Sequence, residues 1–198
     1  MEDFAKELAA ENAEQRERRF AYHEAGHAVV ALRTMRDHIR DVLLGITTHN
    51  DGSVSAGMMN MQVELSTVED LNEFEATAAA VACGGIEGEL AGCGYYQASG
   101  SAADITGLHQ MIGTIACEDY FRATGMRRDE FFQIVIERRS GPRIEVGEKV
   151  AAQIIREERT LFHAITARLL VERRLTREQL LGLYEELAIH VEHLRPPS

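Results

Sequence analysis

The residues best suited to chemistry are two histidines four positions apart, with a glutamate directly after the first. They form the segment His23-Glu24-Ala25-Gly26-His27, which fits the pattern HExxH. Residues at this spacing project side by side from a helix, so the two imidazoles can bind one zinc ion. Glu24 then lies beside the metal, where it can take a proton from a water whose pKa the metal lowers toward ~7. The pattern predicts metal-assisted hydrolysis of a peptide bond; the alternative is two ordinary histidines beside an ordinary glutamate.

A catalytic zinc site of this kind needs a third protein ligand and leaves its fourth position for water. Side chains of His, Asp, Glu and Cys are all suitable, and hydrophobic periodicity does not choose among them. The choice therefore stays open at this point. The candidates are Asp104, Glu87, Glu89, His49, His109, Cys83, Cys93 and Cys117.

A helix must carry the two histidines, because apolar residues around them recur at helical spacing from Phe20 to Leu32. Residues 1–19 alternate acids and bases and are expected to form a charged helix before it. Gly26 costs a helix interior about 1 kcal/mol relative to alanine, so its presence indicates a close approach by another group.

Downstream of this helix the pattern changes to short apolar stretches. Residues 41–61 predict a β-hairpin whose turn is Asn50-Asp51-Gly52. Ser66 or Thr67 offers an N-cap for an alanine-rich helix, which is expected to break near Gly84-Gly85. The small β element should lie next to the zinc helix.

The remainder of the chain is predicted to be helical. One helix is expected from about Ala103 to Gly125, and a long amphipathic helix from about Glu145 to Arg173. Thr176 and Gln179 form a capping box for a last helix. We therefore predict a mainly α fold with a small sheet, in one domain over residues 1–198 with a frayed tail at 194–198.

The composition and charge of the chain exclude some classes of binding partner and of cellular location. The chain of 198 residues carries a formal net charge of −11, and its basic residues are interleaved with acids, which disfavours nucleic acid as a partner. No uncharged apolar stretch reaches the ~18 residues that a membrane span requires, and the charged start is unlike a signal peptide. A soluble, cytoplasmic protein with its three cysteines reduced is expected.

Residues 21–30 look like the zinc helix of the FtsH peptidase family. The similarity continues through the hairpin, residues 84–90 and residues 99–104, and reaches the closing helices at residues 150–158 and 175–180. These segments follow the family's order, so the resemblance spans nearly the whole chain. It implies a zinc metalloprotease fold and activity.

The resemblance also implies roles for two acids. The family's third zinc ligand is an aspartate that opens the helix after a Gly-rich loop, and Asp104 stands at the matching position. Glu89 matches an acid after the family's Gly-Gly pair and is expected to support a ligand without binding zinc itself. The alternative for Glu89 is an ordinary acid on a helix surface.

The chain departs from the family in several places. FtsH proteins carry membrane spans and an AAA ATPase module, whereas this chain has no GxxxxGK[ST] phosphate loop and no spanning stretch. Ala103 stands where the family usually has asparagine, and residues 127–145 match nothing in it. Such a chain is not expected to unfold a folded substrate by itself.

Three hypotheses follow. The first is a zinc metalloendopeptidase that cuts peptides or unfolded protein segments, with Glu24 as general base. The second is a catalytically silent, zinc-containing binding or regulatory module, and the third is a peptidase subunit that works with a separate ATPase. Glu24 favours the first, because a purely structural zinc site needs no base. A homo-oligomer is implied by the resemblance alone.

Overall fold

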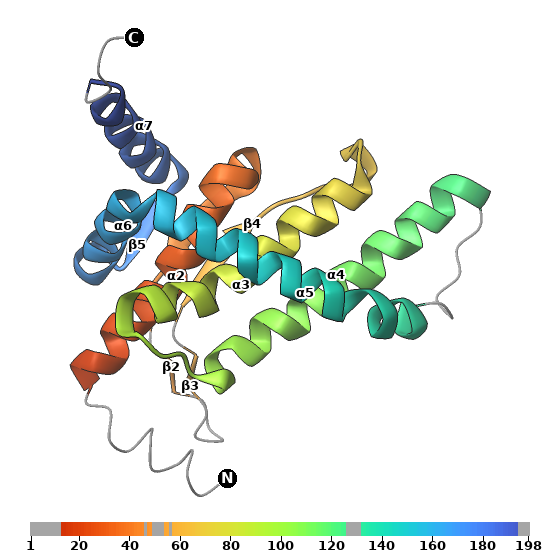
Figure 1. Ribbon diagram of the computed structural model, residues 1–198, viewed down its shortest axis with the longest axis horizontal. Helices are drawn as coiled ribbons and strands as arrows, with labels where there is room; N and C mark the ends of the chain where they lie inside the picture. Colours follow the sequence, from red (N-terminus) through yellow and green to blue (C-terminus); the bar gives the residue numbers. More distant parts are fainter. Residues whose placement is uncertain (1–12, 46, 49–53, 56, 126–131, 194–198) are drawn as a thin grey trace, which may run out of the picture.

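The computed structural model describes residues 13–45, 47–48, 54–55, 57–125 and 132–193, which form a mainly helical fold with a small antiparallel sheet, as predicted (Figure 1). None of its helices is both long and apolar enough to cross a membrane. The predicted tail at 194–198 and residues 1–12 lie outside the described part. Residues 13–19 belong to the same helix as His23 and His27, so they do not form a separate helix before it. The elements are α2 (Ala13–Thr34), η1 (Arg36–His38), β1 (Ile39–Leu43), β2 (Thr47–Thr48), β3 (Val54–Ser55), β4 (Met58–Met61), η2 (Leu65–Thr67), α3 (Leu71–Cys93), α4 (Ala98–Thr124), α5 (Phe132–Glu157), α6 (Arg159–Glu172), β5 (Arg174–Thr176) and α7 (Arg177–His193).

Helices α2 and α3 touch through their backbones at a set of glycines. A Cβ added to Gly26 would lie 2.0 Å from the carbonyl oxygen of Gly84, and one on Gly88 would lie 2.3 Å from that of Tyr22. The close approach predicted at Gly26 is confirmed. The predicted break at Gly84-Gly85 is wrong, because this packing offsets the low helix propensity of glycine and α3 continues to Cys93.

The predicted hairpin is present in its strand pairing. Strand β1 pairs with β4, and β2 with β3, both antiparallel, while the turn residues 49–53 lie outside the described part. Strand β5 pairs with the other side of β1, giving the order β4-β1-β5. Its three residues were missed because Leu175 is their only apolar residue, too little for an alternating pattern.

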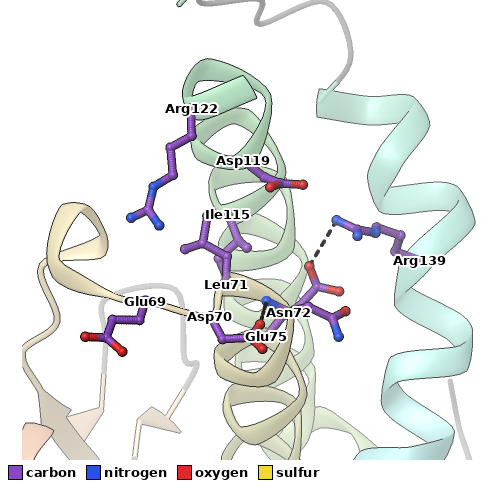
Figure 2. A pocket seen from close by; sticks show the side chains of 9 residues that line it. All are labelled: Glu69, Asp70, Leu71, Asn72, Glu75, Ile115, Asp119, Arg122 and Arg139. Atoms are coloured by element: carbon purple, nitrogen blue, oxygen red, sulfur yellow. Dashed lines mark hydrogen bonds and ion pairs between the residues drawn. The ribbon is translucent and has the colours of Figure 1, made fainter. Parts of the chain in front are cut away.

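The N-terminus of α3 differs from the prediction. Asp70 caps this helix by accepting hydrogen bonds from the backbone N–H groups of Asn72 and Glu73, both at 2.9 Å. Ser66 and Thr67 are not the cap, because they lie in the separate 3-10 turn η2. Figure 2 shows Asp70 beside Asn72 at this end of α3.

Two ion pairs to a buried glutamate join α3 to α5 near the same end. Glu75 is 1% exposed and accepts from Arg143 at 2.7 Å and from Arg139 at 3.3 Å, the second contact being visible in Figure 2. Gly147 of α5 packs against the backbone of Ala79 farther along α3. These contacts hold α5 across α3 (Figure 1).

Two helix limits need correction. Helix α4 begins at Ala98, five residues before the predicted Ala103, because the backbone N–H of its N-cap Gln97 donates to the buried Glu89 at 2.9 Å. Asp104 therefore lies in the second turn of α4. The predicted end at Gly125 is confirmed, since this glycine adopts the left-handed conformation with φ 71°.

The single helix predicted from Glu145 to Arg173 is two helices. Helix α5 begins earlier, at Phe132, passes through Pro142, and ends at Glu157, while α6 begins at Arg159. Packing against α3 outweighs the cost of about 3 kcal/mol that a proline imposes on a helix interior. The capping box of the last helix is confirmed, with hydrogen bonds from Thr176 N to Gln179 Oε1 and from Gln179 N to Thr176 Oγ1.

Candidate metal centre

Three side chains from two helices converge at one point. His23 and His27 project from α2 as predicted, and Asp104 projects from α4. The two Nε2 atoms of the histidines are 3.1 Å apart, and Asp104 Oδ2 lies 3.0 Å from His23 Nε2 and 3.5 Å from His27 Nε2. Two nitrogens and one oxygen thus form a nearly equilateral triangle.

The triangle has the size that zinc requires. Bonds of about 2.0–2.1 Å in a tetrahedral arrangement place neighbouring ligand atoms about 3.3 Å apart, which the three observed distances bracket. Gly85 of α3 faces the histidines, and a Cβ there would lie 2.5 Å from His23 Nε2 and 2.6 Å from His27 Nε2. The donor set, its spacing and the room left by Gly85 all fit Zn²⁺.

The outer nitrogens of both imidazoles are engaged by α3. His23 Nδ1 lies 2.8 Å from Glu89 Oε1, and His27 Nδ1 lies 2.7 Å from the carbonyl oxygen of Val81. Both partners are acceptors, so each Nδ1 carries the proton and each Nε2 turns its lone pair toward the triangle when the rings are neutral. Glu89 is fully buried, and the alternative of a surface acid is wrong.

Glu24 lies beside the triangle, and its carboxylate is short of hydrogen-bond partners among the described residues. It is 6% exposed, and its Oε2 atom has no hydrogen-bond partner among the described residues. Burial raises the pKa of its carboxyl, although the two nearby histidines oppose the shift. The backbone before β4 comes close, since a Cβ on Gly57 would lie 2.5 Å from Glu24 Oε1. Such a carboxylate is suited to accept a proton.

Without a metal, the site pairs a protonated His23 with an ionised Asp104. Burial alone would lower the pKa of His23, but hydrogen bonds to Asp104 and Glu89 outweigh it and raise the pKa to about 10. Burial would raise the pKa of Asp104, but hydrogen bonds from His23 and His27 hold it well below its usual range. At neutral pH the metal-free protein therefore carries a proton on His23 that a metal must displace.

We expect zinc binding to release about one proton at pH 7 and the zinc affinity to rise about tenfold per pH unit between pH 6.5 and 8.5. Calorimetry in buffers of different ionisation enthalpy measures both quantities, and a flat affinity without proton release would contradict the expectation.

Because the pKa of His23 is raised in the folded protein, its stabilising contribution is full below about pH 6.5 and is lost as the pH rises through about 10. Thermal unfolding of the metal-free protein should show this loss.

A large apolar cavity adjoins the site. Its volume is 650 Å³, and its walls include Glu24, His27 and Asp104. Five of the chain's seven methionines line it, which gives soft walls that adapt to different apolar groups. These methionines are Met35, Met58, Met59, Met61 and Met111.

Among the described residues, the other sequence candidates for the third ligand are not part of this cluster. Glu87 lines a separate groove with Arg156 and His163, and His109 lies farther along α4. Cys83 is buried, and burial raises the pKa of its thiol to about 12; Cys93 and Cys117 are half-buried and are in no disulfide among the described residues. His49 lies outside the described residues.

Sequence reasoning missed three residues at the site. Gly57 and Gly85 act through space that they leave free, which a single sequence does not reveal. Arg19 falls in the segment predicted as a charged helix, with no role at the site, but it is 1% exposed and contacts Glu89. Its position one turn before His23 was the available signal, because residues four apart share a helix face.

Comparison with known proteins adds nothing to this geometry: no protein-family model matches the chain, and no curated protein sequence matches it.

Proposed function

We propose that the protein is a zinc-dependent metalloendopeptidase that hydrolyses peptides or unfolded protein segments. The proposal depends on one observation above all: a triangle of two histidine nitrogens and one aspartate oxygen, with the buried carboxylate of Glu24 beside it. The Oε2 atom of that carboxylate has no hydrogen-bond partner in the part of the chain that the structure describes. The resemblance to the FtsH peptidase family supports the same activity. A structural zinc site gives no reason to bury such a carboxylate.

In the proposed mechanism, His23, His27 and Asp104 would hold Zn²⁺, which would act as a Lewis acid when bound. Glu24 takes a proton from the attacking water while the oxygen of that water forms a bond to the peptide carbonyl carbon. The carbon–nitrogen bond then breaks, and Glu24 passes the same proton to the leaving amine. Glu89 and the Val81 carbonyl keep the two imidazoles oriented throughout.

The methionine-lined cavity gives the proposal a substrate preference. Burying a large apolar side chain contributes about 1.5–3 kcal/mol, so a peptide with Leu, Phe or Met next to the scissile bond should exceed its Gly counterpart by about 10–100-fold in kcat/KM. A peptide series varied at that position measures the effect. Met111→Gln should reduce the preference, whereas His109→Gln on the same helix should not. Equal turnover of all peptides would contradict this role of the cavity.

The direct test uses a permanently unfolded, labelled protein as substrate. Zinc-loaded enzyme should cleave it, removal of zinc by a chelator should stop cleavage, and returned zinc should restore it. Failure of the folded, zinc-loaded protein to cleave any unfolded protein or peptide would overturn the proposal. The silent binding module or the subunit of a separate ATPase would then be favoured.

A homo-oligomeric assembly and a cytoplasmic location stay predictions.

A further inference from the structure

A buried arginine stands behind the metal centre. Arg19 of α2 is 1% exposed and Glu89 of α3 is completely buried, and they are joined by a contact of 3.2 Å between Arg19 Nη1 and Glu89 Oε1. That same oxygen accepts from His23 Nδ1 at 2.8 Å. The second oxygen, Oε2, accepts from the backbone N–H of Gln97 at 2.9 Å. Both oxygens of this carboxylate are therefore held.

Stability alone does not account for the pair. Removing an arginine and a glutamate from water costs several kcal/mol per ion, and apolar residues of similar volume are often as stabilising or more so. The chain nevertheless places both charges in its interior, one turn before a candidate metal ligand. The shared Oε1 atom gives a reason, because the guanidinium and the imidazole approach it together and limit each other's position.

We infer that Arg19 is a positioning residue for the metal: it fixes the Glu89 carboxylate, and through it the ring of His23. Without the guanidinium, the Glu89 side chain loses its charged partner and one of the contacts that set its rotamer. The His23 ring then loses a fixed acceptor at Nδ1 and no longer holds Nε2 toward His27 and Asp104. This inference rests on the proposed metal site but not on peptide hydrolysis.

The test is metal binding, measured with Zn²⁺ affinity and with the visible absorption of bound Co²⁺, which reports ligand geometry. Arg19→Met should weaken Zn²⁺ binding by about 10–100-fold, the usual cost of losing a partner of a ligand, and should alter the Co²⁺ spectrum. The matched control is Arg143→Met, which removes an arginine from the buried Glu75 on the same helix. Residues 75 and 89 are about 21 Å apart along α3. The control should keep wild-type zinc affinity and spectrum whatever its stability.

Two further variants separate positioning from general damage. Arg19→Lys keeps a cation and should recover part of the lost affinity, and it replaces Arg19→Met in the comparison if that variant does not fold. In a Glu89→Gln background, Arg19→Met should cause no further loss, because the arginine acts through Glu89. Wild-type affinity and Co²⁺ spectrum in Arg19→Met, or an equal loss in both backgrounds, would overturn the inference. Either result leaves the proposed peptidase intact, whereas a wild-type protein that binds no metal would overturn both.

Discussion

Glu24→Gln is expected to lower kcat for peptide hydrolysis by about 10²–10⁴-fold while zinc stays bound. Glutamine keeps the size of the side chain but cannot take a proton from water. Glu24 is not one of the three proposed metal ligands, His23, His27 and Asp104, so the substitution leaves these ligands unchanged. Turnover of an unfolded substrate and zinc content, measured on the same preparation, check both halves of the expectation.

The same variant separates a catalytic role from a structural one. Glu24 Oε2 is buried and has no hydrogen-bond partner within the described ranges, and burial disfavours the charged form of the carboxyl. A neutral amide should therefore leave the unfolding temperature equal or higher, as is common where a protein retains an unfavourable group for function. A Glu24→Gln protein that cleaves at the wild-type rate would exclude Glu24 as the base. One that loses zinc would make its role structural.

The sequence predicted the helix that carries the two histidines well because its signal is local. His23 and His27 lie four apart, and the helix that carries them follows from apolar periodicity. The third residue of the triangle, Asp104, has no such local signal. Asp104 lies on another helix, and spacing along the chain does not report distance in space. Only the resemblance to FtsH singled it out from the other candidates.

The errors in the helix limits share one cause. Gly84 and Gly85 read as a break because local propensity disfavours glycine. In the fold, the backbone of α2 lies where a side chain of Gly84 would be, and the imidazoles of His23 and His27 lie where one of Gly85 would be. Ala98 was not predicted as the start of α4 because a long-range hydrogen bond from Gln97 to Glu89 fixes it. The role of Arg19 was missed for the same reason, since its partner Glu89 is 70 residues away. Tertiary contacts decide these positions, and periodicity does not include them.

Asp104→Ala is expected to weaken zinc binding by more than about 100-fold, because losing a ligand should exceed the 10–100-fold cost of losing a ligand's partner. The variant should also lose peptide hydrolysis at zinc concentrations that saturate the wild type. Competition with a chelator of known affinity measures the first effect, and cleavage of the unfolded substrate measures the second.

The matched control lies on the same helix. His109 was an equal candidate by spacing, yet it is outside the triangle, so His109→Ala should bind zinc and cleave as the wild type does. The metal-free proteins give an independent check. Asp104 stabilises the protonated form of His23, so the pKa of His23 in Asp104→Ala should fall from about 10, which NMR titration of the ring can follow. Unchanged zinc affinity in Asp104→Ala, with its loss in His109→Ala, would reverse the assignment of the third ligand and with it the geometry on which the proposed hydrolysis depends.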